Sequence, residues 1–415
     1  MEVVKLDNEI KAAEIMLDNT ISFNDVNAKG TPLKTIGNFK QVLDKHKIEV
    51  SYDEIAKDIC FNKFDDYQEN ERLTIIADTC IKERLNVTED KVASWIKVIA
   101  KDNKINPFKE IIEFYKNDDP DIIEEVFDTL EIDYPMNVWY GDLREYYFEI
   151  FYRWCINLVH LSLNSIANGY QSEGLLVLLG KQGCYKSTWV SKLMPNKKLF
   201  LGDRRLDPNN KDSIIENTKY LLVELAELDS TMKAEQSSLK GFITSKADKY
   251  RAPFDKVAQT YPRVTTFIGT VNKKNFLKDE TGNRRYFIIP VISCDVKALD
   301  KIDMCKFWGR IYNDYLNGED WYLSQKYKDI QEIENKKYLA ESDLSIMLDE
   351  AIDQESPDYH VYNVSEICEK LGIPIKGAAA KIKIEMQKRG VEYKLHKINN
   401  KPKWGYKIHR FKNQF

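Results

Sequence analysis

The chain has 415 residues, of which 43% are hydrophobic and 31% are charged, and its formal net charge is −4. Such a length exceeds one compact core and predicts two to four domains. The longest uninterrupted apolar stretch, Leu175 to Leu179, is too short to cross a membrane, and the charged start MEVVKLDNEIKAAE lacks the apolar segment of a secretory signal. The seven cysteines form no CxxC pair. We therefore expect a reduced cytoplasmic protein without disulfides, structural zinc or membrane contact.

The modest net charge conceals a strong asymmetry along the chain. Residues 376–415 contain 12 Lys or Arg against two acids, a net charge of +10, whereas residues 118–133 contain eight acids and no Lys or Arg. A basic tail on an acidic protein predicts an anionic partner for that tail alone.

The first part of the chain is predicted to be mostly helical. Residues 1–100 are expected to form a helical N-terminal domain, because IKAAEIMLD, NFKQVLDKH, YDEIAKDIC, LTIIADTCIKERL and EDKVASWIKVIAK repeat apolar residues three or four apart. Residues 101–170 are expected to form a helical connector or collar, with prolines breaking residues 102–137 and a long aromatic helix over 139–167. Plain buried helices explain these segments, and they carry no evident chemistry.

Residues 171–345 have a different pattern and are predicted to form an α/β domain. Three short apolar runs, GLLVLLG (174–180), KYLLVE (219–224) and VTTFIGT (264–270), alternate with helical segments. This alternation predicts a parallel sheet covered on both faces. Because sites in such sheets lie at the carboxyl ends of the strands, the polar residues after each run are the candidates for chemistry.

The first run leads into GKQGCYKS, residues 180–187, which resembles a phosphate-binding loop of the form GxxxxGK[ST]. In such a loop the backbone N–H groups and the lysine bind the phosphates, and the hydroxyl binds Mg²⁺. Tyr185 departs from the pattern, because it replaces the glycine before the lysine, and a left-handed tyrosine costs roughly 1–3 kcal/mol. The alternative is an ordinary glycine turn with a solvated lysine. The predicted ATP-binding residues are Gly180, Gln182, Gly183, Cys184, Tyr185, Lys186, Ser187 and Thr188.

The second run is followed by two carboxylates at helical spacing, Glu224 and Glu227. An ATPase needs one carboxylate near the metal and another to polarise the attacking water. We assign Glu224 to Mg²⁺ together with Ser187, and Glu227 to the water. The two roles could be exchanged, or Asp229 could contribute.

The third run ends near Asn272, whose amide can bind the γ-phosphate or the attacking water. The segment DETGNRRYF then contains the adjacent Arg284 and Arg285. A positively charged finger that stabilises the transition state raises the rate of other nucleotide hydrolases by about 10³–10⁵. The distance of this pair from the loop in sequence suggests that one arginine serves a neighbouring subunit, although a lone arginine pair is usually only a surface feature.

Together, GKQGCYKSTW, VELAEL, YRAPF, TVN and TGNRRYF resemble the virulence-associated protein E family, over roughly residues 30–330. The resemblance implies a superfamily 3-like AAA+ ATPase that hydrolyses ATP with Mg²⁺, forms a hexameric ring and unwinds DNA 3′ to 5′ when a phage or mobile element replicates. Some relatives carry a fused primase, but the start of this chain shows no strand-borne carboxylate cluster, and none is expected here.

A ring helicase also needs contacts with DNA. Superfamily 3 relatives place a pore hairpin between the second and third strands, where this chain has Lys246, Lys249, Arg251 and Lys256. Cations in a pore would follow the phosphate backbone of single-stranded DNA without reading its sequence. Arg251 could instead hold the fold or contact the nucleotide.

The basic tail is predicted to form a winged helix, residues 355–415, separable from the rest of the chain within a polar linker, IDQESPDYH (352–360). VSEICEKLG ends at Gly372, AAAKIKIEMQKRG ends at Gly390, and VEYKLHKI and KWGYKIHR can pair as a wing. The alternative is a solvated charged tail, but the apolar periodicity and the glycine stops favour a fold. The predicted duplex-binding residues are Lys381, Lys383, Lys388, Arg389, Lys401 and Lys403.

These features favour an ATP-dependent DNA helicase and replication initiator. The main alternative is a nucleotide-gated DNA-binding regulator with little or no unwinding activity, which Tyr185 keeps open. A small-molecule kinase is disfavoured, because it would explain neither the basic tail nor the arginine pair.

Overall fold

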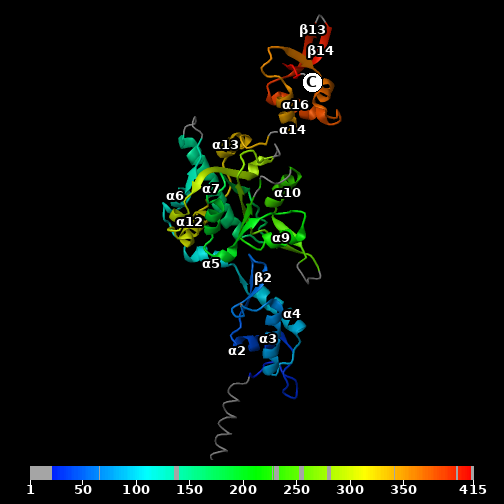
Figure 1. The fold of residues 1–415 in the computed structure, drawn as a ribbon. Coiled ribbons are helices and arrows are strands. Elements are labelled where there is room, and N and C mark those ends of the chain that lie inside the picture. The colour runs from blue at the N-terminus through cyan, green and yellow to red at the C-terminus, as the bar shows by residue number, and fades with distance from the viewer. Residues whose placement is uncertain are drawn as a thin grey trace, which may run out of the picture.

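The computed structural model describes residues 21–64, 66–134, 140–226, 228, 233–251, 257–277, 282–340, 342–398 and 401–412. Figure 1 shows an N-terminal unit (residues 21–105) and a C-terminal unit (342–412) on opposite sides of a central body (106–340). No described helix is long and apolar enough to cross a membrane. The predicted mixed α/β class is confirmed, because helices pack around several sheets.

The N-terminal unit contains a small sheet as well as helices. Its elements are α2 (Ile36–Lys45), β1 (Val50–Asp53), β2 (Asp58–Phe61), α3 (Glu69–Lys82), α4 (Glu89–Asp102) and β3 (Lys104–Ile105), with strand order β2-β1-β3. The expectation of a helix over YDEIAKDIC was wrong, because this segment forms the β1–β2 hairpin. Asp53 turns the chain by accepting the N–H groups of Ile55 and Ala56, and Lys57 adopts a left-handed φ of 56°.

The central body is built on a six-stranded sheet of order β4-β11-β5-β10-β7-β6. Its strands are β4 (Leu130–Ile132), β5 (Leu175–Leu179), β6 (Phe200–Arg204), β7 (Leu222–Ala226), β10 (Thr266–Val271) and β11 (Tyr286–Cys294). Five of them are parallel, and only β4 runs antiparallel, at the edge. The three apolar runs therefore form β5, β7 and β10 at the centre of a parallel sheet, as expected.

Helices cover both faces of this sheet (Figure 1). Leu176 and Leu178 of β5 join one buried cluster with α7 and α12, whereas Leu175 and Val177 join a second cluster with α10. The helices are α5 (Pro107–Phe114), α6 (Ile122–Phe127), α7 (Tyr140–Ser162), α8 (Lys186–Lys192), α9 (Lys211–Asn217), α10 (Lys233–Ile243), α11 (Val296–Leu299), α12 (Met304–Leu316) and α13 (Gln325–Lys336). Of the predicted connector helices, α7 packs directly on β5 and β11 of the sheet, whereas α5 and α6 pack against α12.

The C-terminal unit has its own core, formed by three helices and a sheet of order β12-β14-β13. Its elements are α14 (Asp343–Ala351), β12 (Tyr359–Tyr362), α15 (Val364–Leu371), α16 (Ala378–Lys388), β13 (Tyr393–Ile398) and β14 (Lys401–His409). The two expected helices and the expected strand pair are present. The expected linker is not: Ile352 is buried in this core, and Leu348 on α14 belongs to it, so the unit begins before residue 355.

Candidate functional site

The glycine-rich loop connects the carboxyl end of β5 to α8. The N–H of Gly180 donates to the Val271 carbonyl at 3.0 Å, and a Cβ on Gly180 would lie 2.4 Å from the Val291 carbonyl oxygen. Gly183 has a φ of +86°, with open space around it. Gly180 is therefore required for space and Gly183 for backbone conformation. Between these glycines and α8, Cys184 is buried and its carbonyl accepts the N–H of Cys294, while Gln182 is exposed.

Tyr185 occupies the left-handed conformation that a glycine would normally take at this position, with φ 64° and ψ 20°. Its ring is 63% exposed, so little packing offsets the backbone cost. The strain expected from the sequence is thus located at this residue.

Replacing Tyr185 with glycine is expected to stabilise the protein by about 1 kcal/mol relative to Tyr185→Ala, because both variants remove the ring and only glycine relieves the left-handed strain. Urea unfolding followed by circular dichroism would measure the difference. If the alanine variant were as stable as the glycine variant, Tyr185 would not be under strain.

Lys186 begins α8 and is only 7% exposed. Its Nζ donates to the carbonyl oxygens of Gly180 at 2.7 Å and Lys181 at 2.9 Å, and to Oδ1 of Asn272 at 3.2 Å. These three oxygen acceptors are neutral, and a fourth contact is the Sγ of Cys184 at 3.4 Å. Among the described residues no carboxylate lies within ion-pairing distance of this ammonium group. A nearly buried cation without a counter-charge is suited to binding an anion.

The carboxyl ends of β5, β10 and β7 bring the candidate residues of the three runs together. Asn272 follows β10, which pairs with β5, and it is exposed beside Lys186. On the neighbouring β7, Glu224 is 2% exposed, and its Oε1 accepts the Thr270 hydroxyl at 3.0 Å. Its Oε2 accepts the N–H of Asp203, which lies on β6 and has a φ of 54°.

The position of Glu224 differs from the expectation that a strand ends there. Strand β7 continues to Ala226, so Glu224 lies inside the sheet with both carboxylate oxygens accepting hydrogen bonds. Glu227 and Asp229 lie outside the described residues. Ser187 and Thr188 are exposed in the first turn of α8, directly after the lysine.

Arg284 and Arg285 lie at the other end of the sheet. They form the 3₁₀ turn η3 (Asn283–Arg285) just before β11, whose Tyr286 pairs with Leu175 at the start of β5. At about 3.3 Å per residue, the length of β5 separates these arginines from the loop of the same chain by roughly 15 Å. Arg284 is exposed, and Arg285 is half-buried.

Two amides of α13 hold this arginine turn, and the sequence patterns did not identify them. Gln331 donates to the carbonyls of Arg284 and Tyr286 at 3.1 and 3.0 Å, and Asn335 donates to those of Asn283 and Tyr286 at 2.8 and 3.0 Å. Both amides are almost fully buried. The only available signal was a pair of amides four residues apart on one helix face. Beside the turn lies a hollow of about 1300 Å³, which Arg284, Arg285 and Lys328 help to line.

A β-hairpin follows α10 in the interval where a pore hairpin was expected. It consists of β8 (Ala247–Tyr250) and the antiparallel β9 (Gln259–Pro262). Lys246, Lys249 and Arg251 are exposed along β8 and at its ends, whereas Lys256 lies outside the described residues. Exposed cations on a hairpin are compatible with contacts to a nucleic-acid backbone.

The hairpin is anchored by a buried ion network that reaches the N-terminal unit. Arg263 is fully buried and binds Asp248 through both its Nε, at 2.7 Å, and its Nη2. Lys57, from the β1–β2 turn, places its Nζ 3.6 Å from Asp248, and burial lowers the pKa of Lys57 to about 8.

We expect Asp248→Asn to destabilise the protein by about 3–5 kcal/mol, because it leaves the buried charges of Arg263 and Lys57 without a carboxylate. The control Lys57→Met replaces the buried lysine with an uncharged side chain of similar length and leaves the Arg263–Asp248 pair intact. Its loss of stability should be far smaller. Thermal unfolding of both variants would test this, and equal effects of the two changes would contradict it.

The six predicted duplex-binding cations of the C-terminal unit divide into two groups. Arg389, Lys388 and Lys403 bind acidic residues of the unit, with Asp349 at 2.6 Å, Glu385 at 3.2 Å and Glu366 at 2.7 Å as their partners. Lys381 and Lys383 on α16 and Lys401 on β14 are exposed. Lys388 is exposed as well, so the two groups differ in ion pairing rather than in exposure. Lys381, Lys383 and Lys401 are therefore better placed for an anionic partner, whereas Arg389 also ties α16 to α14.

The model of the virulence-associated protein E-like domain matches residues 114–340, which is more than half of the chain. The chain belongs to the virulence-associated protein E-like family. The family domain contains the glycine-rich loop, Glu224, Asn272, the β8–β9 hairpin and the arginine turn. The C-terminal unit lies beyond it.

Two solved structures of the C-terminal region of NrS-1 are distantly similar to this virulence-associated protein E-like chain, each over 90% of its length. One has 14% sequence identity and a TM-score of 0.47 over 98% of that chain, and the other has 16% identity and a TM-score of 0.49 over 99%. Likenesses this distant carry no argument about function. No curated protein sequence matches the chain.

Proposed function

We propose that this protein is an ATP-dependent DNA helicase and replication initiator of a phage or mobile genetic element. In this proposal the central body is an AAA+ ATPase of the superfamily 3 type. Numbered along the chain from β5, the parallel strands lie in the order 5-1-4-3-2 (β11-β5-β10-β7-β6), which supports that fold. The order helix, strand, helix, helix, strand, strand in the C-terminal unit supports a winged helix.

The observation that carries the proposal is the charge of Lys186, which no described carboxylate compensates. Its ammonium group is held among neutral oxygens at the loop, beside exposed Asn272. A triphosphate would supply the missing negative charge, and the loop between Gly180 and Lys186 would offer backbone N–H groups to it. In a plain glycine turn the lysine would be exposed to solvent, whereas Lys186 is nearly buried in this loop.

Each residue at the carboxyl edge then has a role. Mg-ATP, when bound, supplies the phosphoanhydride bond whose hydrolysis drives movement along DNA. Ser187 would hold Mg²⁺, with Glu224 acting on the metal through water, since both Glu224 oxygens already accept hydrogen bonds. Glu227 would orient the attacking water, and Asn272 would move from Lys186 to the γ-phosphate.

The remote arginine turn supports a ring in which each site is shared. Arg284 and Arg285 lie at the opposite end of β5 from the loop, so in this proposal they would serve the loop of a neighbouring subunit rather than their own. The amides of Gln331 and Asn335 would keep the turn in position. A homo-hexamer is the proposed assembly, with single-stranded DNA contacting the β8–β9 hairpins of its subunits.

Steady-state ATP hydrolysis by the full chain with Mg²⁺, measured with and without single-stranded DNA, tests this proposal. We expect hydrolysis that rises when DNA is added. Nucleotide binding without DNA-stimulated hydrolysis would instead support a nucleotide-gated DNA-binding regulator. Two observations favour this second function. Tyr185 holds the loop in a strained left-handed conformation, and both oxygens of Glu224 already accept hydrogen bonds, so neither residue is free to rearrange for hydrolysis.

Removing the C-terminal unit after Ala340 is expected to retain basal ATP hydrolysis and to abolish most duplex binding. Leu277 binds the chain at Tyr338 and Ala340, so this cut keeps the central body complete, and it removes α14 together with the core it belongs to. Fluorescence anisotropy with a labelled duplex over a salt series would measure the loss, because affinity through Lys and Arg falls steeply with salt. Equal duplex binding with and without the unit would place the DNA site wholly in the central body.

A further inference from the structure

The β13–β14 hairpin exposes apolar side chains that the core of the C-terminal unit does not need. Trp404 is 57% exposed, Leu395 is 48% exposed and Tyr393 is 45% exposed. Leu395 pairs directly with Trp404, and Tyr393 pairs with Tyr406, so all four lie on one face of the hairpin. Only Tyr406, at 3% exposed, is covered by the core.

The aromatic rings on this face form a continuous series. Tyr393 contacts the buried Tyr406 edge-on at 5.0 Å and is stacked with Trp404 at 6.1 Å, with an angle of 17° between the two planes. The series therefore extends from the core to solvent and ends in an exposed indole. Nearly parallel, exposed ring planes provide a flat surface on which another ring can stack.

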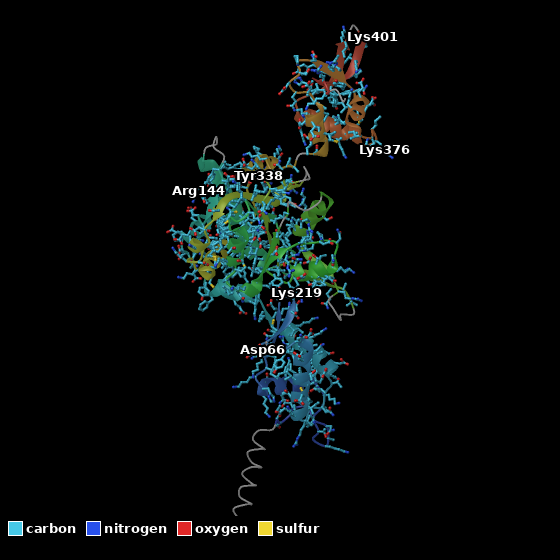
Figure 2. The ribbon with its side chains drawn as sticks, in the orientation of Figure 1. Asp66, Arg144, Lys219, Tyr338, Lys376 and Lys401 are labelled. Atoms are coloured by element: carbon cyan, nitrogen blue, oxygen red, sulfur yellow. The ribbon has the colours of Figure 1, made fainter. Side chains whose placement is uncertain are left out.

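The same hairpin is rich in positive charge. The two strands contain Lys394, Lys397, Lys401, Lys403 and Lys407 and no acidic residue. Lys394, Lys397, Lys401 and Lys407 are exposed, and Figure 2 shows Lys401 at the end of the hairpin away from the central body. Lys397 lies on the face of the rings, whereas the other three project from the opposite face of the hairpin. The surface therefore favours a partner that is both anionic and flat, which an acidic protein segment is not.

We propose that the β13–β14 hairpin binds unpaired single-stranded nucleic acid by stacking a base on Trp404 and Tyr393, while its lysines contact the phosphates. Bases of a duplex are already stacked, so their faces cannot reach these rings. The hairpin would thereby recognise the single strand, and the exposed Lys381 and Lys383 of α16 would contact duplex. This extends the proposed DNA binding of the unit and requires no nucleotide hydrolysis.

Equilibrium binding of the full chain to labelled oligodeoxythymidine, without nucleotide, tests the proposal. Stacking of one base on an aromatic ring is worth about 1–3 kcal/mol, so Trp404→Ala should weaken binding about 5- to 150-fold. Trp404→Phe should retain most of the affinity, and Trp404→Leu should lose as much as alanine, because it retains bulk but no ring plane. Phe114→Ala is the matched control, since Phe114 is 81% exposed on α5 and should bind as the wild type does.

An oligomer of abasic deoxyribose phosphate separates stacking from charge. Wild type and Trp404→Ala should bind this abasic strand equally, and a duplex should also show little difference between them. An equal loss on oligodeoxythymidine and on the abasic strand would overturn the proposal, as would unchanged binding by Trp404→Ala and Trp404→Leu. Tighter binding of the wild type to anionic phospholipid vesicles than to oligodeoxythymidine would also overturn the proposal. A parallel titration with oligouridine would show whether DNA or RNA is preferred.

A chain that fails to hydrolyse ATP could still stack a base on Trp404. The proposed base stacking and the proposed ATP-dependent function can therefore fail independently.

Discussion

Replacing Lys186 with alanine is expected to weaken ATP binding on the order of 100-fold or more, because the phosphates lose two or three charge-assisted hydrogen bonds of about 1.5–3 kcal/mol each. Lys186 is the cation that the structure holds among neutral oxygens at the loop. Titration calorimetry with ATP and Mg²⁺ would measure the change.

Lys181→Ala is the matched control for this experiment, because Lys181 is an exposed lysine of the same loop that contributes only its carbonyl to Lys186. It should bind ATP almost normally. Equal losses from the two substitutions would show that the loop attracts nucleotide only through its general positive charge. Unchanged binding by Lys186→Ala would remove the loop from the proposed site.

Arg284→Ala and Arg285→Ala chains are both expected to bind ATP normally. One of the two arginines is the proposed finger that stabilises the transition state, and the variant without that arginine should hydrolyse ATP about 10³–10⁵ times more slowly. The arginines lie far from the loop of their own chain, so a shared site would put the affected step at the loop of the neighbouring subunit. Lys328→Ala, which changes another cation of the same hollow, should hydrolyse ATP almost as the wild type does.

Mixing the slow arginine variant with Lys186→Ala should restore part of the activity. Some interfaces in a mixed ring would join an intact loop to an intact arginine turn. Activity that stays absent at every mixing ratio, once native mass spectrometry shows that mixed rings form, would contradict a shared site.

The sequence was sufficient to predict the parts of the fold that depend on local patterns. The apolar runs at β5, β7 and β10 were recognisable because strands buried on both faces need continuous apolar residues. The left-handed strain at Tyr185 followed from its place in the loop pattern. Helices α15 and α16 were recognisable from their spacing and from the glycines that end them.

Features that depend on partners distant in sequence could not be predicted in this way. Strand β1 pairs with β3, about fifty residues later, whereas its own apolar spacing imitates a helix. The burial of Glu224 within β7 depends on Thr270 and Asp203, and the placement of Lys57 depends on Asp248. The amides of Gln331 and Asn335 became meaningful only when α13 was seen to pack on the arginine turn.

Strand separation is the most direct test of the proposed function. A forked duplex with a labelled strand would be incubated with the full chain, ATP and Mg²⁺, with Lys186→Ala as the inactive control. The account predicts that the wild type releases the labelled strand only when ATP is hydrolysed, and that Lys186→Ala does not release it. Wild-type chains that hydrolyse ATP on DNA and leave the fork paired would contradict the helicase assignment.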